Sequence, residues 1–462
     1  MSYRSTDRKV GVASRNYPCA AAFGVAFALA CCTLSLDAAA QGAGLNTLYR
    51  FTGGADGAIL FRGPTFDAAG NLYGDAIYGA NACPDTEGSA GVGCGTIWKL
   101  DTSNTFTTLV TFSGSDNGAD PDGNLTIRAK KIFGTANAGG AANLGTVFQV
   151  GTDGSGFQTL YTFSGLDGAR PQTKLRLDAA GDMFSATYSG GPAFNGTAGS
   201  GFGVLFEIPK AGGYVALHNF TGGADGGGPA RIFLDKAGTI FGAAETGGAC
   251  AGTGLPAAGC GTIYSYTPST GAFQTLYTFT GGADGYKPTL AGVAGIAEAG
   301  SLFGSTNLGG ALGYGTLFEL RPNSSGGYDY VHLYDFTGGA DGAYPSVAKL
   351  RPSGELVGGT NLGPITQSGS GAGVLFDFKQ GRLTTLYTFL NDANGGYPYG
   401  TPIVSKSGLI YGTTGYGGVS PCNTSGGVLI STFGCGTIYL YNPFGASAKA
   451  RAADADDSLE DR

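Results

Sequence analysis

The sequence predicts an all-β protein, and more specifically a seven-bladed β-propeller with four-stranded blades. Three observations lead to this fold. Glycine accounts for 87 of 462 residues and only 13% of residues are charged, which is typical of turn-rich β structure. A segment that first ends at Phe51 recurs along nearly the whole chain, and every recurrence is followed by the same order of short, alternating, strand-like segments.

The recurring segment defines seven copies of one repeat. It reads TLYRF at first, then TLVTF, TLYTF, ALHNF, TLYTF, HLYDF and TLYTF, and these segments end at Phe51, Phe112, Phe163, Phe220, Phe279, Phe336 and Phe389. Four short strands per copy at this spacing indicate a propeller blade. A β-solenoid is the alternative, but its coils are usually shorter than these copies.

Each copy contains its elements in a fixed order. After the phenylalanine comes a Gly/Asp turn such as TGGADG (52–57), then a loosely apolar stretch, a turn such as DAAGN (67–71) and a strand beginning with LYG. A Gly-rich connection follows, and the copy ends in a strand of one type: GTIWKL (95–100), GTVFQV (145–150), GVLFEI (203–208), GTIYSY (261–266), GTLFEL (315–320), GVLFDF (373–378) and GTIYLY (436–441). The alternation of apolar and polar residues predicts half-buried strands.

The order of the repeat predicts how the ring closes. The pattern opens with the LYRF strand and ends with the GTIYLY strand, so every blade is complete only if the two ends meet. We expect Thr47–Phe51 to be the outermost strand of the last blade, next to Thr437–Tyr441. The propeller domain would then span residues 41–445.

One aromatic position recurs in the last strand of every copy, and it holds Trp98, Phe148, Phe206, Tyr264, Phe318, Phe376 and Tyr439. Aromatic residues dominate protein cores, so we predict a packing layer between blades. A stacking ladder for a ligand is the alternative.

Antiparallel strand order places connections alternately on the two faces of a propeller. The TGGADG turns and the Gly-rich connections should therefore share one face, which we call the looped face. The opposite, short-turn face should hold the DAAGN-type turns and the last hairpin of each blade. Long and variable loops on a rigid scaffold are where binding tends to occur, so the looped face is the candidate binding face.

Six of the nine cysteines follow residue 40, and the other three are Cys19, Cys31 and Cys32. The six form local pairs within the three longest Gly-rich connections: Cys83 with Cys94, Cys250 with Cys260, and Cys422 with Cys435. This placement favours three disulfides in an oxidising compartment, where each would restrict a long loop. A zinc site is the alternative, but close Cys pairs are absent and the only histidines are His218 and His332.

The first forty residues have the pattern of an export signal. Basic residues Arg4, Arg8, Lys9 and Arg15 precede an apolar run over 20–36 and the small residues 38–40. We therefore expect a periplasmic or extracellular protein without a transmembrane segment in the mature chain. A lipid anchor at Cys31 is a further alternative. At the other end, residues 446–462 are expected to be a disordered acidic tail.

The charge balance argues against two classes of partner. Removal of residues 1–40 takes away four basic and two acidic residues and leaves 22 basic against 31 acidic, a net charge of −9. A nucleic acid or an anionic membrane is therefore not expected as the main partner. The sequence does not identify the partner, and an extracellular glycan or a protein is the candidate.

Aspartates recur in the Gly/Asp turns. Asp56, Asp167, Asp225, Asp284 and Asp341 match one another, and Asp116 or Asp120 and Asp392 stand in the looser copies. These carboxylates could surround the channel mouth and bind a ligand or calcium. Asp before Gly is also ordinary chemistry of a tight turn, and this interpretation is favoured. No cofactor is predicted.

Tyrosines follow the same turns in the last three copies, as Tyr286, Tyr344 and Tyr397, and Arg170 and Lys287 lie near this register. Their rings could stack on a sugar or a peptide, or could cover the edge of the innermost strand. Neither histidine lies in a catalytic pattern, and no phosphate-binding or nucleophile motif is present. A non-catalytic binding scaffold is therefore the predicted function, with a lyase or hydrolase of extracellular polysaccharide as the alternative.

The repeat also resembles a known family. LYTFTGGADGYKP (276–288) and the segment from Ala299 to Leu320 resemble the GloVer-type tandem repeat of exported bacterial proteins, the "choice-of-anchor" group, and the resemblance covers about residues 46–442. It implies an exported or surface-associated β-repeat protein without an assigned activity or catalytic residues. Members of that group often end in an anchoring segment, whereas the acidic tail of this chain has no apolar helix.

Overall fold

A computed structural model describes residues 44–444, except for 81–82, 84–90, 251–257, 294–299, 347, 352–353 and 368. The chain divides into Met1–Ala40 and a compact unit, Gln41–Arg462, to which all described residues belong. The predicted export signal, with Cys19, Cys31 and Cys32, and the predicted tail 446–462 lie outside the described residues.

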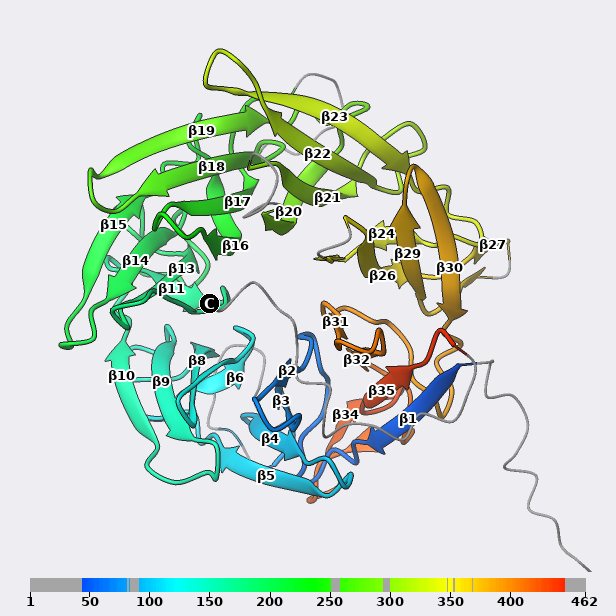
Figure 1. Ribbon diagram of the computed structural model, residues 1–462. Coiled ribbons are helices and arrows are strands. Elements are labelled where there is room, and N and C mark those ends of the chain that lie inside the picture. The colour runs from blue at the N-terminus through cyan, green and yellow to red at the C-terminus, as the bar shows by residue number, and fades with distance from the viewer. Residues whose placement is uncertain are drawn as a thin grey trace, which may run out of the picture. The chain divides into compact units, whose positions relative to one another are not determined.

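Seven antiparallel sheets form a ring within the compact unit, and each is one blade (Figure 1). The predicted seven-bladed propeller is therefore confirmed. Three blades have four continuous strands, in order from the axis outwards. Blade 1 contains β2 (Thr65–Phe66), β3 (Leu72–Ala76), β4 (Thr96–Leu100) and β5 (Phe106–Thr111). Blade 4 contains β16 (Gly227–Leu234), β17 (Ile240–Thr246), β18 (Thr262–Thr267) and β19 (Ala272–Thr278). Blade 5 contains β20 (Tyr286–Val293), β21 (Leu302–Leu308), β22 (Thr316–Pro322) and β23 (Tyr328–Asp335).

In three further blades the innermost strand is split into two short pieces. Blade 2 contains β6 (Ala119–Pro121), β7 (Thr126–Arg128), β8 (Lys131–Ala138), β9 (Thr146–Gly151) and β10 (Gln158–Thr162). Blade 3 contains β11 (Ala169–Pro171), β12 (Arg176–Leu177), β13 (Met183–Ser189), β14 (Val204–Ile208) and β15 (Val215–Asn219). Blade 6 contains β24 (Ala343–Pro345), β25 (Lys349–Leu350), β26 (Leu356–Leu362), β29 (Val374–Lys379) and β30 (Arg382–Thr388).

Blade 7 joins the two ends of the repeat region. It contains β31 (Ile403–Val404), β32 (Ile410–Thr414), β35 (Thr437–Tyr441) and, outermost, β1 (Leu45–Arg50). The antiparallel register pairs Leu45 with Tyr441 and Arg50 with Thr437. The predicted closure by the N-terminal strand is confirmed, although β1 begins slightly earlier than predicted. No helix long and apolar enough to cross a membrane occurs in the part of the chain that the structure describes.

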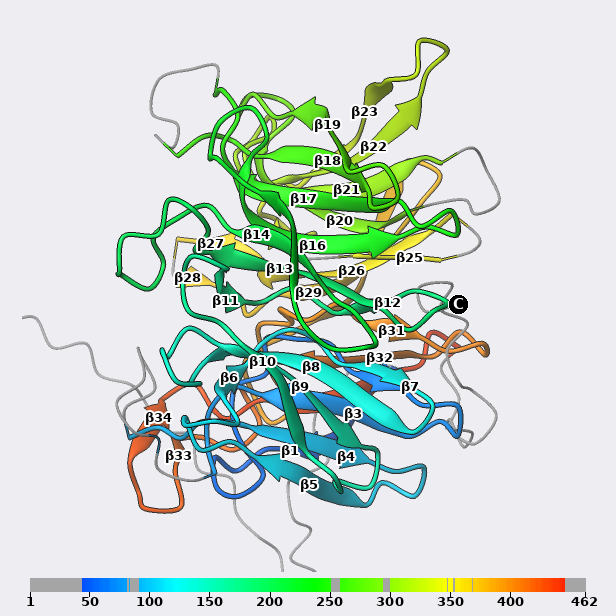
Figure 2. The ribbon, with the colours of Figure 1, turned by 90° about the vertical axis from the view of Figure 1, so that its left-hand side faces the viewer.

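The turns and the Gly-rich connections share one face, as predicted. The first residues of the connections donate backbone hydrogen bonds to the preceding turns, for example from Ala80 N to Gly54 O at 2.7 Å and from Gly191 N to Gly165 O at 2.9 Å. Two connections contain small hairpins, β27 (Ile365–Thr366) with β28 (Gly369–Ser370) and β33 (Cys422–Asn423) with β34 (Leu429–Ser431). Both hairpins lie on the same side of the ring (Figure 2).

The recurring aromatic residues form the packing layer between blades. Trp98, Phe148, Phe206, Tyr264, Phe318, Phe376 and Tyr439 are all 0% exposed. Each contacts the phenylalanine that ends the outer strand of the preceding blade, with ring centroids 5.9 Å apart for Phe51 and Trp98 and 5.3 Å apart for Phe112 and Phe148. A side chain at Gly74 would place its Cβ 2.2 Å from the Trp98 ring, so the glycine makes room for the aromatic residue.

A backbone hydrogen bond joins each blade to the next at the inner rim of the looped face. Its donors are the third residues after the turn aspartate or its equivalent, which we call the rim residues: Ile59, Asp120, Arg170, Gly228, Lys287, Tyr344 and Tyr397. All have φ between 53° and 60°, a left-handed conformation that costs a non-glycine residue about 1 kcal/mol. The rim residue's N–H donates to a carbonyl of the preceding blade, as from Lys287 N to Cys260 O at 3.1 Å. The backbone is thus fixed while the side chain varies between blades.

The three predicted disulfides are present. Their Cα–Cα distances are 5.0 Å for Cys83–Cys94, 5.3 Å for Cys250–Cys260 and 4.9 Å for Cys422–Cys435. In each pair, the second cysteine also supplies the carbonyl that accepts the rim-residue hydrogen bond of the next blade. Each disulfide therefore restrains a long connection next to a junction between blades.

Candidate functional site

The five matching turn aspartates accept hydrogen bonds within their own turns. Asp56 Oδ2 accepts from Tyr49 Oη at 3.1 Å and from Thr52 N at 2.8 Å, and Oδ1 accepts from Thr52 Oγ1 at 2.6 Å. Asp284 and Asp341 have the same three kinds of donor. Asp167 is similarly bonded to Tyr161 and Ser164, and Asp225 to His218 and Thr221. These contacts agree with the turn interpretation, while ligand binding by the aspartates stays a prediction.

The equivalents of these aspartates in the looser copies are asparagines. Asn117 Oδ1 accepts from Ser113 N at 3.0 Å, and Gly118 N closes the turn. In the last copy the same place belongs to Asn394, which is 7% exposed. The suggested residues Asp116, Asp120 and Asp392 are therefore wrong, because the spacing around these two turns differs. No group of three or more His, Cys, Asp or Glu side chains suited to a metal ion lies in the described ranges.

The predicted tyrosines occupy two different positions. Tyr344 and Tyr397 are rim residues, in register with Arg170 and Lys287, whereas Tyr286 comes one residue earlier. Tyr344 contacts Tyr314 at 6.1 Å between ring centroids. Tyr397 belongs to a larger set of rings, described below.

Charged side chains and one tyrosine, from five blades, converge on the axis of the ring. We call Arg62, Asp75, Asp122, Arg170, Tyr188, Glu245 and Lys287 the axial cluster. Its central contact joins blades 1 and 2, with Arg62 Nε 2.7 Å from Asp122 Oδ1 and Arg62 Nη2 3.0 Å from Asp122 Oδ2. Arg62 Nη2 also reaches Gln172 O in blade 3 at 3.5 Å.

Asp75 is the most buried member of the axial cluster, with 2% of its surface exposed. Its Oδ1 atom has no hydrogen-bond partner among the residues that the structure describes. Burial and the nearby charge of Asp122 raise the pKa of the Asp75 carboxyl, and Arg62 offsets part of this rise. Burial also raises the pKa of Asp122, against the effects of Arg62 and Arg170. The axis therefore holds carboxyl groups that gain protons more readily than exposed ones do.

A tyrosine and a glutamate meet across the junction between blades 3 and 4. Tyr188, in β13, lies with its Oη 3.4 Å from Glu245 Oε2 at the end of β17. The rim residue of blade 4 is Gly228, and a Cβ there would lie 3.1 Å from the Tyr188 ring, so the glycine lets the tyrosine approach. Burial and Glu245 raise the pKa of Tyr188 to about 12. Burial raises the pKa of Glu245, while Lys287 and Arg62 oppose the rise.

Five aromatic rings from blades 7 and 1 form a series beside the axial cluster, which we call the aromatic track. The centroid distances along it are 6.0 Å for Phe433–Tyr416, 5.4 Å for Tyr416–Tyr397, 6.0 Å for Tyr397–Tyr399 and 5.2 Å for Tyr399–Phe61. Phe433 is 55% exposed, and the other four rings are half-buried. Tyr78 links the track to the charged residues, because burial, Asp120, Tyr416 and Asp122 all raise its pKa.

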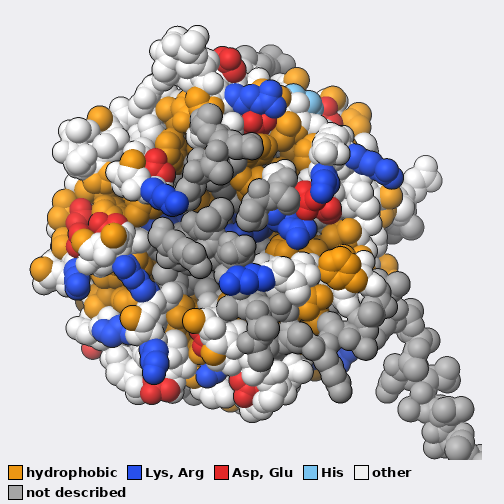
Figure 3. Space-filling view, in the orientation of Figure 1, with side chains coloured by type: hydrophobic (Ala, Val, Ile, Leu, Met, Phe, Trp, Pro, Cys, Tyr) orange, Lys and Arg blue, Asp and Glu red, His pale blue; other side chains and the backbone are white. Residues whose placement is uncertain are grey.

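Exposed apolar side chains also gather on the looped face. Among the described residues, all the exposed large hydrophobic side chains except Val215 and Phe444 belong to its turns and connections: Leu166, Phe202, Leu312, Ile365, Leu390, Val419, Val428, Leu429 and Phe433. The short-turn face, shown in Figure 3, instead carries many lysine and arginine side chains.

The two histidines have structural contacts. His218 takes the place of the tyrosine that elsewhere donates to the turn aspartate, with Nε2 3.1 Å from Asp225 Oδ2 and its ring stacked on Phe273 at 3.8 Å. Burial lowers the pKa of His218 and outweighs the opposing effect of Asp225. His332 lies 3.0 Å from Asp335 on an outer strand. Neither histidine touches the axial cluster.

Sequence reasoning identified Arg170, Lys287 and Tyr397 but missed most of the site. The missed residues are Arg62, Asp75, Asp122, Tyr188 and Glu245 of the axial cluster and Phe61, Tyr399, Tyr416 and Phe433 of the aromatic track. A position-by-position comparison of the seven copies contains the signal. Tyr188 and Glu245 occupy the position that holds Asn137, Asn307 and Asn361 in blades 2, 5 and 6. Asp75 occupies a position that holds a small residue in the other copies.

A family model described as the Gloeobacter/Verrucomicrobia repeat matches residues 32–255 and again 253–457. Among curated proteins, none matches the chain.

Several solved structures are similar in fold. An oligogalacturonate lyase from Vibrio parahaemolyticus is 9% identical, with a TM-score of 0.51 over 86% of this chain and 93% of that one. A puromycin-hydrolysing peptidase of Mycobacterium tuberculosis is 12% identical, with a TM-score of 0.48 over 90% and 58%. A gluconolactonase from Xanthomonas campestris is 12% identical, with a TM-score of 0.42 over 86% and 89%. At these identities the similarity concerns the fold alone.

Proposed function

The chain belongs to the Gloeobacter/Verrucomicrobia repeat family, and we propose that it is an exported, non-catalytic scaffold that binds an extracellular glycan at the mouth, which is the opening of the ring on the looped face. The observation that carries this proposal is the convergence of the aromatic track and the axial cluster in one place. The three disulfides and the predicted export signal support an extracytoplasmic location.

A sugar fits the chemistry of this mouth. The apolar C–H faces of sugar rings pack on aromatic rings, and the track offers such rings from Phe433 to Phe61. Sugar hydroxyls both donate and accept hydrogen bonds. Glu245 offers acceptors, Lys287 and Arg170 offer donors, and the Tyr188 phenol can both donate and accept.

A second candidate is an enzyme, a lyase or hydrolase, that acts on extracellular polysaccharide. The Tyr188–Glu245 contact favours it, because a carboxyl with a raised pKa beside a phenol is suited to proton transfer. Glu245 would hold or accept a proton, and Arg170 and Lys287 would orient a polar substrate.

A glycan array read in parallel with a turnover assay separates the two candidates. The scaffold proposal expects retained glycans and no new reducing ends or unsaturated products. Product formation that disappears in Glu245→Gln would favour the enzyme. An array on which the chain retains no glycan would contradict the binding proposal.

The aromatic track is tested by Tyr397→Ala. Other rim residues have different side chains on the same backbone, so this variant should fold. Loss of one stacked ring should weaken glycan binding about tenfold. Tyr328→Ala, at the short-turn end of β23, is the matched control and should bind like the wild type. Equal affinities for all three proteins would remove the track from the binding site.

A further inference from the structure

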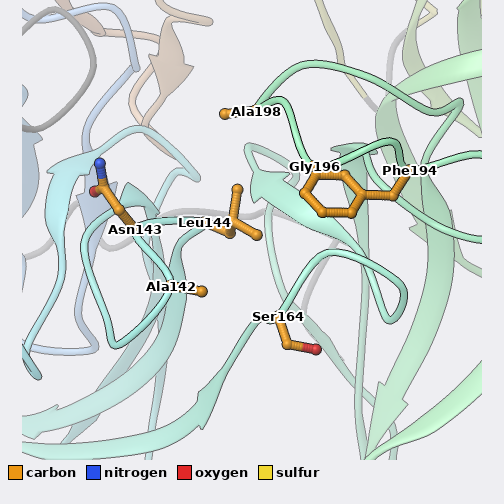
Figure 4. A pocket seen from close by; sticks show the side chains of 7 residues that line it. All are labelled: Ala142, Asn143, Leu144, Ser164, Phe194, Gly196 and Ala198. Atoms are coloured by element: carbon orange, nitrogen blue, oxygen red, sulfur yellow. The ribbon is translucent and has the colours of Figure 1, made fainter.

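A pocket of about 340 Å³ lies on the looped face between blades 2 and 3. It is lined by Ala142, Asn143 and Leu144 of one connection, Ser164 of the next turn, and Phe194, Gly196 and Ala198 of the blade 3 connection. Phe194 and Leu144 face each other across it (Figure 4). The pocket thus offers an aromatic ring and small apolar side chains, with one amide side chain, Asn143, at its wall, while the Ser164 hydroxyl donates to Asp167 within its own turn.

Arg170 connects this pocket to the axial cluster. Its backbone N–H donates to Leu144 O at 2.9 Å, and Leu144 lines the pocket. A Cβ at Gly199, next to the lining residue Ala198, would lie 3.3 Å from the Arg170 guanidinium. On its other side, the positive charge of Arg170 affects the pKa of both Tyr188 and Asp122. One side chain therefore borders both sites.

The blade 3 connection is held in place without a disulfide. The Phe194 ring packs on the backbone of the preceding turn so closely that a Cβ at Gly165 would lie 2.3 Å from it. Phe194 N donates to Gly191 O at 2.9 Å, and Asn195 N donates to Ser200 Oγ at 3.1 Å. The aromatic wall of the pocket is thus already positioned.

We infer that the looped face binds an internal stretch of a glycan chain, with one sugar unit in the Phe194 pocket and others over the axial cluster and along the aromatic track. This inference rests on the proposed function. It adds that the ligand is a polymer that crosses the mouth, rather than a chain end or a single sugar. The pocket lies between blades 2 and 3, the aromatic track lies in blades 7 and 1, and the axial cluster adjoins both. Only a ligand of several sugar units can contact all three.

The test measures affinity against chain length. Wild type, Phe194→Ala and Ala198→Trp are titrated with neutral cello-, xylo-, malto- and laminari-oligosaccharides, from disaccharide to hexasaccharide. Ala198→Trp fills the pocket and leaves Phe194 in place, so it covers the case in which Phe194→Ala loosens the connection. Tyr328→Ala is again the control, because this tyrosine lies at the short-turn end of β23, away from the looped face.

We expect both pocket variants to lose about tenfold in affinity for the hexasaccharide that wild type binds, and to match wild type on the disaccharide. Tyr328→Ala should match wild type at every length. Length-independent affinity in wild type, or pocket variants that keep the full hexasaccharide affinity, would overturn the inference while leaving the proposed function intact. Absence of wild-type binding to every oligosaccharide would overturn both.

Discussion

At the scale of single residues, the seven rim residues show how one backbone supports different chemistry. All seven share a left-handed conformation and an inter-blade hydrogen bond. Their side chains range from Gly228, which admits Tyr188, to Lys287, whose charge acts on Glu245. Because the hydrogen bond uses only the backbone, the side chain at each rim position can vary without loss of the junction.

The pH dependence of stability should include a contribution from His218. Burial lowers its pKa in the folded state, while in the unfolded chain a histidine has a pKa of about 6.5. The unfolded state then binds more protons, so stability should fall as the pH drops below about 6.5. His218→Tyr restores the tyrosine–aspartate contact of other blades and should flatten thermal unfolding profiles in this range. A decline as steep as that of wild type would contradict this account, and His332→Tyr serves as the control.

Glu245 should have the opposite effect on stability. Burial raises its pKa in the folded state above the unfolded value of about 4.3, so the native state binds more protons and gains stability as the pH falls through the folded pKa. Glu245→Gln should therefore unfold at a higher temperature than wild type at pH 7, and the difference should disappear in acid. A variant less stable than wild type at pH 7 would show that the ionised carboxylate is instead stabilised by Lys287 and Arg62.

At the scale of elements, β1 is the piece on which the ring depends. It pairs with β35 from Leu45 to Arg50, and Phe51 beyond it packs on Trp98 of the next blade. Deletion of residues 45–52 should therefore abolish cooperative unfolding of the whole propeller, because blade 7 loses its outer strand and blade 1 loses its aromatic contact. Circular dichroism during heating measures this, and a transition like that of wild type would contradict the closure.

The Cys422–Cys435 disulfide supports the same closure. A Cβ at Gly53 would lie 2.3 Å from Asn423 O, so the connection that contains this disulfide packs directly on the first turn. In addition, Cys435 O accepts a hydrogen bond from Ile59 N at 2.9 Å. Replacement of both cysteines by serine should lower the free energy of unfolding by about 2–4 kcal/mol. Denaturant titration of the oxidised proteins measures the loss. A change below about 0.5 kcal/mol would show that the hairpin is held without the bond.

At the scale of the whole molecule, the sequence predicted the architecture better than the site. Repetition reveals strands, turns and ring closure because every blade needs the same turns and the same packing between blades. Phe51 and Trp98 therefore have counterparts in every copy. The site is built from the residues in which copies differ. Arg62 and Asp122 belong to different copies of the repeat, and they meet because the ring places the inner edges of blades 1 and 2 next to each other. Spacing within one copy could not show that contact.

Hydrogen exchange, measured with and without a glycan that the array retains, tests whether a glycan binds at the mouth of the looped face. We expect the glycan to slow exchange in the backbone around Tyr188, Glu245 and Tyr397–Tyr399, and to leave exchange in the short-turn hairpins unchanged. Protection confined to the short-turn face, around Lys210 and Lys236, would contradict binding at the mouth.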